Sequence, residues 1–189
     1  MKQIIKLTLI LFLICAVVAG VLGVINELTW QRIEMLEKEK TAKAYGKVLA
    51  AEGYEEVDFA AKGVEKVVEK VTVDKISKAV GAEGYVVELT FSGAQGNITL
   101  AVGVGADYRC TGISVIKHSE TSGLGAVAAS DSEKGVAFRE QFIGEDAGIA
   151  LKKAGGRIDA LSGATITSRS VTHATSVAIR AVMALDQAA

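Results

Sequence analysis

The chain has 189 residues, which is enough for one membrane segment and one domain of ordinary size. Its 21 basic and 22 acidic side chains give a formal net charge of −1, which excludes a nucleic-acid-binding role based on overall positive charge. Cys15 and Cys110 are the two cysteines, and no Cys-x-x-Cys pair occurs, so the chain alone supplies no thiolate set for an iron–sulfur cluster or structural zinc.

The most apolar stretch lies near the N-terminus. As a helix, the uncharged run at residues 7–25 would span about 28 Å, close to the hydrocarbon thickness of a bilayer. Lys2 and Lys6 precede the run and Glu27 follows it, which predicts a single-pass protein of the cytoplasmic (inner) membrane with its N-terminus inside. A signal peptide cleaved at Val17-Val18-Ala19 is the alternative, but the run is longer than a usual signal core and favours a retained anchor.

The apolar run and the charge pattern together divide the chain into three parts. Residues 1–27 are expected to form the cytoplasmic N-terminus and transmembrane anchor. Residues 28–52 combine the mixed charges of Glu37-Lys38-Glu39-Lys40 with an apolar stripe, which predicts a helical stalk. Residues 53–189 are then an extracytoplasmic domain.

Within that domain, short strand-like runs alternate with turns. Strands are expected at residues 85–91, 98–104 and 111–117, and in the second half of the ambiguous segment 64–80, which predicts an antiparallel meander. The capping-box pattern Ser130-Asp131-Ser132-Glu133 opens a helix to about Ile143. Ala154-Gly155-Gly156 predicts a hairpin between residues 149–152 and 157–161, and a final helix is expected at residues 171–185. The fold class is therefore α+β, with a transmembrane helix ahead of a small domain that has a mainly antiparallel sheet and flanking helices.

A run of small and hydroxyl residues separates the expected strand at residues 158–161 from the final helix. It reads Ser162-Gly163-Ala164-Thr165-Ile166-Thr167-Ser168. Unpaired backbone N–H groups and the positive end of the helix dipole at such a turn suit a phosphate. Gly163 and Ala164 leave room beside the backbone, and Ser162, Thr167 and Ser168 add hydroxyl donors. By itself, the run is equally compatible with a plain turn and a capping hydroxyl.

A second loop of interest follows the strand expected at residues 111–117. Its sequence is His118-Ser119-Glu120-Thr121-Ser122-Gly123-Leu124-Gly125. Gly123 and Gly125 allow a flat ring to approach the main chain, and Leu124 offers it an apolar contact. Glu120 and Thr121 offer polar groups to the rim of such a ring.

Residues 159–165 resemble the signature at which FMN is joined to threonine through its phosphate. That signature belongs to the FMN-binding subunits of the Rnf and sodium-pumping NADH:quinone oxidoreductase complexes. The loop at residues 118–125 resembles the His-x-Glu-Thr-Pro-Gly-Leu-Gly loop of the same family, with Ser122 where proline is usual, and Gln141-Phe142 matches the family's Gln-Phe after a helix. The resemblance covers nearly the whole chain, whose brevity is closer to the Rnf G subunit than to the longer C subunit of the quinone reductase.

The resemblance implies a cofactor and the residues that hold it. Thr165 would carry covalent FMN, and Asp159 to Ala164 would be recognised by the flavin transferase that installs FMN from FAD. The flavin site implied by the resemblance comprises Thr165, Ser162, Gly163, Ala164, Thr167, Glu120, Thr121, Gly123, Leu124 and Gly125.

The resemblance also implies an electron-carrier subunit of a membrane complex. That complex would couple electron transfer between ferredoxin and NAD to sodium or proton translocation, with a second flavin-bearing subunit and iron–sulfur subunits as partners. No catalytic residue, metal site or independent catalytic activity is expected on this chain, because Ser162 lacks a Gly-x-Ser-x-Gly context and His118 and His173 are far apart. The alternative function is a membrane-anchored extracytoplasmic interaction or assembly protein without a cofactor.

Overall fold

A computed structural model describes residues 2–188, which fall into two compact units with the boundary between Lys40 and Thr41. Helix α1 (Lys2–Val48) accounts for the whole described part of the first unit. Its run from Gln3 is long and apolar enough to cross a membrane. Residues 2–48 are helical, and the chain has no proline that would interrupt them. The helix ends at Val48, four residues before the expected end of the stalk.

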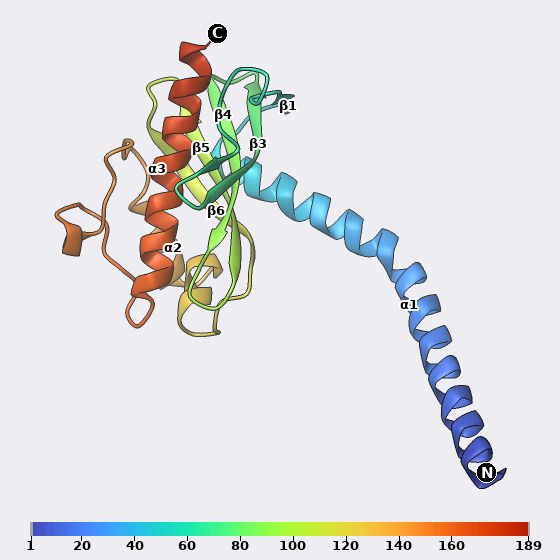
Figure 1. Cartoon of the computed structure of the whole chain (residues 1–189). Helices are drawn as coiled ribbons and strands as arrows, with labels where there is room; N and C mark the ends of the chain where they lie inside the picture. Colours follow the sequence, from blue (N-terminus) through green and yellow to red (C-terminus); the bar gives the residue numbers. More distant parts are fainter. Residues whose placement is uncertain (1, 189) are drawn as a thin grey trace. The chain divides into compact units, whose positions relative to one another are not determined.

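The second unit is built on an antiparallel sheet (Figure 1). Its strands are β1 (Gly53–Val57), β2 (Val67–Val68), β3 (Val71–Val80), β4 (Gly84–Ser92), β5 (Asn97–Gly105) and β6 (Cys110–His118). They lie in the order β1-β3-β4-β5-β6, and β2 pairs with β3. The meander from β3 to β6 confirms the predicted strands and the α+β class.

Alternation along the strands gives each face of the sheet its own apolar cluster. Val87 and Val102 belong to the main core, which α3 (Thr165–Gln187) covers (Figure 1). Val86 and Ala101 point to the opposite face, where they pack against the last turns of α1. Glycines make that second contact close, because a Cβ at Gly103 would lie 2.5 Å from the carbonyl oxygen of Val48.

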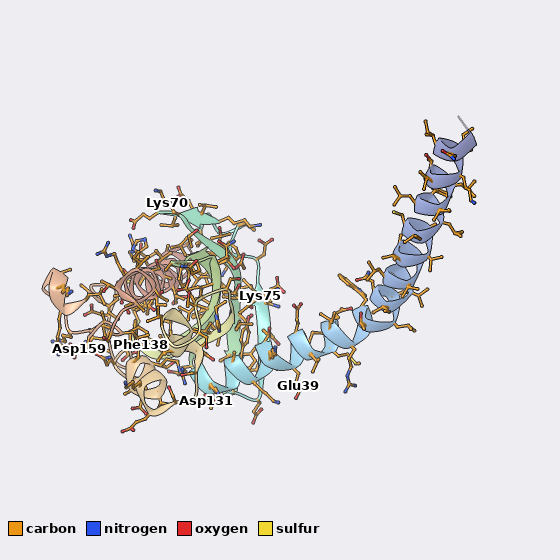
Figure 2. All side chains as sticks on the ribbon, turned by 90° about the horizontal axis from the view of Figure 1, so that it is seen from below. Glu39, Lys70, Lys75, Asp131, Phe138 and Asp159 are labelled. Atoms are coloured by element: carbon orange, nitrogen blue, oxygen red, sulfur yellow. The ribbon has the colours of Figure 1, made fainter. Side chains whose placement is uncertain are left out.

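Three short helices lie between β6 and α3 in the chain: η1 (Gly125–Ala129), α2 (Glu133–Glu140) and η2 (Lys152–Ala154). Of these, η1 and α2 pack near β6. The hydroxyl of Ser132 caps α2 by accepting from the amide of Gly135 at 3.3 Å, so this helix begins at Glu133, later than the expected start at Ser130. It ends at Glu140, before the expected end at Ile143. Phe138 and Phe142 pack edge to face with ring centres 5.2 Å apart. Figure 2 shows Phe138 among the interior side chains, with Asp131 and Asp159 at the surface.

The predicted hairpin around Gly155 is wrong. Leu151 and Ile158 form a single parallel bridge, not an antiparallel pair, and η2 lies between them. Gly155 adopts a left-handed φ of 84° and closes η2, while the amide of Gly156 bonds to the carbonyl of Leu151 at 3.0 Å. The glycine pair therefore ends a helical turn instead of joining two strands.

The final helix begins earlier than expected, at Thr165 instead of Val171. Hydroxyl residues in this stretch have the composition of a turn, but three of them bond back to carbonyls four residues earlier in the chain. Ser168 donates to Ala164, Thr172 to Ser168 and Thr175 to Val171, at 2.8–2.9 Å. Because the helix itself satisfies their polar groups, these residues are buried in it. The threonine expected just before the helix is its first residue.

Candidate functional site

Thr165 is the first residue of α3, and its side chain is partly buried. The preceding Ala164 has φ −128° and ψ 43° and has no polar side chain, so no side-chain hydrogen bond caps the first turn of α3. The first amides of a helix have no carbonyl partner within it and carry the positive end of its dipole. The Thr165 hydroxyl therefore lies where an anion is favoured.

The turn ahead of Thr165 is held in shape by Ser168. The Ser168 hydroxyl is fully buried, accepts from the amide of Leu161 at 2.9 Å and donates to the carbonyl of Ala164 at 2.9 Å. Gly163, with φ 74°, takes the left-handed conformation that this turn needs. Ser162 and Gly163 are exposed, so the side of the turn away from the core is open.

Asp159, at the start of the motif, is fixed by two neighbours. Its amide donates to Gln141 Oε1 at 2.7 Å, and its carbonyl accepts from Gln141 Nε2 at 3.5 Å. The Asp159 carboxylate is exposed and pairs with Lys152 Nζ at 2.5 Å. The backbone of the motif is thus anchored to the end of α2, while its carboxylate remains at the surface.

Glu120 joins the glycine-rich loop to both the β4–β5 turn and α3. Its Oε1 accepts from the amides of Ala94 at 2.8 Å and Gln95 at 3.0 Å, and its Oε2 accepts from the Thr167 hydroxyl at 2.5 Å. Burial favours a raised pKa, but these three donors and the nearby His118 lower the pKa of Glu120 below its ordinary value. The carboxylate is therefore ionised at neutral pH and holds three segments together.

Two glycines make room for that carboxylate. A Cβ at Gly93 would overlap Glu120 Oε1, and a Cβ at Gly125 would overlap Glu120 Oε2 and lie 2.7 Å from Thr167 Oγ1. Gly123 is different, because no atom lies within 4 Å of a Cβ built there. Glycine is favoured at this position only because the backbone adopts a left-handed φ of 76°.

Leu124 brings the two motifs into contact. Its side chain is 45% exposed, and its Cδ2 lies 3.0 Å from a Cβ built on Gly163. Thr121 is exposed, and its carbonyl accepts from the amides of Leu124 and Ala126, each at 3.2 Å. The structure thus places Glu120 and Gly125 beside Thr167, and Leu124 beside Gly163.

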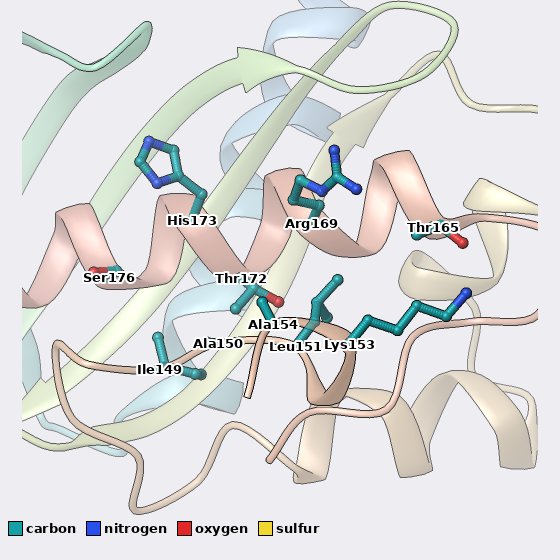
Figure 3. A pocket seen from close by; sticks show the side chains of 10 residues that line it. All are labelled: Ile149, Ala150, Leu151, Lys153, Ala154, Thr165, Arg169, Thr172, His173 and Ser176. Atoms are coloured by element: carbon teal, nitrogen blue, oxygen red, sulfur yellow. The ribbon is translucent and has the colours of Figure 1, made fainter. Parts of the chain in front are cut away.

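Two cavities meet at Thr165. The first, of about 280 Å³, runs along α3 past Arg169, Thr172 and His173 to Ser176, and the apolar side chains of Ile149 and Leu151 lie on its other side (Figure 3). The second, of about 320 Å³, lies over the motif itself, from Ile158 to Gly163. Leu151, Lys153 and Thr165 border both cavities. Space for a bulky group is therefore available on either side of the threonine.

Some of these contacts could not be predicted from the sequence. Gly93 and Lys153 belong to no motif, and the contacts of Ser168 that shape the turn depend on the early start of α3.

The two histidines have separate partners. His118 Nδ1 accepts from the amide of Glu120 at 3.3 Å, and His173 Nε2 lies 3.3 Å from Glu69 Oε2. Within residues 2–188, no group of three or more His, Cys, Asp and Glu side chains could hold a metal ion.

Comparison with known proteins agrees with this geometry. A family model for the FMN-binding domain matches residues 93–180, which include both motifs. The chain is 35% identical to the G subunit of the ion-translocating oxidoreductase complex of Methanosarcina acetivorans, over 98% of this chain and 97% of that protein. It is 34% identical to the G subunit of the Na⁺-translocating ferredoxin:NAD⁺ oxidoreductase complex of Acetobacterium woodii, over 98% of this chain and 95% of that protein.

A third relative is the G subunit of the proton-translocating ferredoxin:NAD⁺ oxidoreductase complex of Clostridium ljungdahlii, which is 38% identical over 52% of each chain. The match to the first two relatives is nearly end to end and includes the apolar N-terminal helix. The chain therefore belongs to the family of G subunits of ion-translocating oxidoreductase (Rnf) complexes and carries an FMN-binding domain.

Proposed function

We propose that this subunit carries FMN covalently, through a phosphodiester to the Thr165 hydroxyl, and passes electrons within the membrane complex. The observation that supports this assignment best is the position of Thr165. It is the first residue of a helix that has no side-chain cap, and it borders two cavities. A phosphate on this oxygen would lie at the positive end of the helix dipole, close to amides without helical partners.

The residues around Thr165 fit FMN. Gly163 and Ala164 put no bulky side chain next to the hydroxyl, and Ser162 is exposed on the open side of the turn. An apolar wall at Ile149 and Leu151 faces one cavity, and the half-exposed Leu124 lies on the other side of Gly163. Mixed apolar and polar linings of this kind suit a planar heteroaromatic group with a charged tail.

Bound FMN supplies the electron-transfer chemistry, and the protein supplies attachment and orientation. In the attachment step, the Thr165 oxygen takes the FMN phosphoryl group of FAD: the Oγ1–P bond forms, the P–O bond of the pyrophosphate breaks, AMP leaves and the hydroxyl proton is released. A flavin transferase that recognises Asp159 to Ala164 catalyses this step. Glu120 and Ser168 then hold the loop and the turn against α3.

The proposal extends to location and partners. Helix α1 anchors the chain in the cytoplasmic membrane with the N-terminus inside, so that the FMN-binding domain faces the extracytoplasmic side. A tether prevents loss of the cofactor there and keeps it at high local concentration near the other subunits. Those partners include a second flavin-bearing subunit and iron–sulfur subunits, in a complex that couples electron transfer between ferredoxin and NAD to sodium or proton translocation.

Intact mass spectrometry of the full chain, co-expressed with a flavin transferase, tests the attachment. The wild type and Thr165→Ser should each gain the mass of one whole FMN moiety esterified through its phosphate. Their bands on a denaturing gel should fluoresce. Thr165→Ala should show neither signal. Ser162→Ala is the matched control, because it removes an exposed hydroxyl from the same turn and should still be loaded.

Full loading of Thr165→Ala would contradict the assignment of the residue. An unmodified wild type, made with a transferase that loads another substrate in the same cells, would contradict covalent attachment altogether. The cofactor-free interaction or assembly protein would be favoured only if the native protein, purified from the same cells, also contained no flavin absorbance.

A further inference from the structure

Lys153 is the basic residue that borders both cavities at Thr165. Lys152 borders only the cavity over the motif, and Arg169 borders only the cavity along α3. Figure 3 shows the Lys153 ammonium group and the Thr165 hydroxyl at the same end of the cavity, whereas the Arg169 guanidinium points to the other side of α3 from Lys153. Lys153 therefore lies near any group attached to Thr165, whichever cavity that group enters.

The charge of Lys153 is available for an incoming anion. Asp159 is the carboxylate that borders these cavities, and it is engaged by Lys152 at 2.5 Å. Arg157, nearby in sequence, pairs with Glu145 at 3.7 Å. Among the described residues, no carboxylate pairs with Lys153 and no hydrogen bond uses its ammonium group. Lys153 is exposed, so its ammonium group is free to turn towards an anion in either cavity.

Backbone hydrogen bonds and close packing hold the segment that carries this lysine. Lys153 lies in η2, where the amide of Lys152 bonds to the carbonyl of Ile158 at 2.9 Å and that of Ile158 to the carbonyl of Ala150 at 3.1 Å. A Cβ on Gly156 would overlap the Ala150 carbonyl, so the turn after η2 is closely packed. Leu151 and Ile158 anchor the segment in the core. Little backbone entropy is then lost when Lys153 meets a ligand.

From this geometry we propose that Lys153 binds the phosphodiester of the attached cofactor and fixes the direction in which the cofactor leaves Thr165. The inference rests on the proposed attachment to Thr165. The phosphodiester carries one negative charge next to Oγ1, and a lysine ammonium group is a strong donor to phosphate oxygens. The first amides of α3 and the ammonium group of Lys153 would together hold the phosphate and neutralise its charge.

Phosphorus NMR of the loaded full chain tests this role directly, after intact mass has verified one FMN on each variant. Lys153→Gln should move the ³¹P resonance towards its position in the urea-unfolded loaded protein. Lys153→Arg, which keeps the charge, should stay close to the wild-type position. The matched control is Lys134→Gln on α2, which removes an exposed charge that borders neither cavity and should leave the resonance unchanged.

Coincident ³¹P positions for the wild type and Lys153→Gln would overturn the proposal. If Lys153→Gln takes up too little FMN for a spectrum, loading rates at limiting transferase decide. Loss of one charge-assisted hydrogen bond predicts a rate about ten-fold lower for Lys153→Gln, restored by Lys153→Arg. Equally slow loading of both variants would overturn the role of the charge. An unloaded wild type would instead contradict the attachment to Thr165, so the two failures are distinguishable.

Discussion

The side-chain amide of Gln141 pairs with both backbone polar groups of Asp159, as a neighbouring strand would. Gln141 Oε1 accepts from the Asp159 amide at 2.7 Å, and Gln141 Nε2 donates to the Asp159 carbonyl at 3.5 Å. The next residue, Phe142, is fully buried and packs on Phe138. The Gln-Phe pair at the end of α2 therefore has two tasks: Phe142 anchors the pair in the core, and Gln141 holds the segment that leads to Thr165.

Gln141→Ala should slow the attachment of FMN by about ten-fold at limiting transferase, because the backbone of Asp159 loses its fixed position in the segment that we propose the transferase recognises. Gln141→Glu keeps the stronger contact, from the Asp159 amide, and should be affected less. Intact mass against time gives the rates. Gln187→Ala, at the exposed far end of α3, is the matched control and should load like the wild type. Equal rates for all four proteins would show that the Gln141 contact plays no part in recognition.

Removal of the Glu120 carboxylate should loosen three segments together. Glu120→Ala leaves the amides of Ala94 and Gln95 and the Thr167 hydroxyl without their acceptor. The Thr167 hydroxyl is buried, and a buried donor without a partner costs about 1–3 kcal/mol. Hydrogen exchange followed by mass spectrometry should show faster exchange in peptides covering residues 93–97 and 120–126. Glu133→Ala, at an exposed position on α2, should leave both peptides unchanged. Unaltered exchange in Glu120→Ala would contradict the bridging role of the carboxylate.

The same contacts predict a dependence on pH. The pKa of Glu120 is lower in the folded chain than the ordinary value of 4.5, because hydrogen bonds to the ionised form outweigh burial. Its stabilising contribution is therefore complete above pH 4.5 and is lost as the pH falls through the lower folded value. Protection of the loop amides, after correction for intrinsic exchange, should fall in acid for the wild type and change less for Glu120→Gln. If protection of the loop amides fell equally in acid for the wild type and Glu120→Gln, the lowered pKa of Glu120 would be contradicted.

Gly125 and Gly123 should differ in their tolerance of alanine. At Gly125, a Cβ would overlap a carboxylate that three hydrogen bonds hold in place, so the loop must move away from α3. At Gly123, alanine meets no neighbour and costs only the left-handed φ of 76°, about 1 kcal/mol. Thermal unfolding and loop hydrogen exchange should therefore show the larger loss for Gly125→Ala. The opposite order would show that backbone conformation, and not the Glu120 contact, accounts for the glycine at position 125.

Much of the fold could be predicted from the sequence because its strongest signals are local. Apolar alternation and Gly- or Asn-bearing turns located β4, β5 and β6, and an uncharged run located the apolar part of α1. The start of α3 was misplaced because helical back-bonding by Ser168 and Thr172 is invisible in composition. The hairpin was misplaced because Gly155 and Gly156 also suit the end of a helical turn.

The candidate site was predicted only as two separate motifs. Their connection depends on contacts between residues far apart in the chain, such as Glu120 with Ala94, 26 residues away, and with Thr167, 47 residues away. No local pattern predicts that Gly93 must leave room for the Glu120 carboxylate. The cavities around Thr165, and the position of Lys153 at their border, likewise depend on how residues 149–158 fold against α3.

Ser168→Ala should show whether the conformation of the turn matters for FMN attachment when the attachment residue itself is kept. The variant keeps Thr165 but leaves the partly buried amide of Leu161 without its acceptor, at a cost of about 1 kcal/mol. The turn from Leu161 to Ala164 then loses both side-chain hydrogen bonds to Ser168 and keeps only the backbone bond from the Ser168 amide to the Ala164 carbonyl. FMN attachment should slow, and hydrogen exchange in residues 159–165 should accelerate. Ser170→Ala, two residues along α3, is the matched control because no hydrogen bond of its hydroxyl holds the turn. Normal loading of Ser168→Ala with accelerated exchange would show that the transferase shapes the turn itself; normal values of both would contradict the role of Ser168.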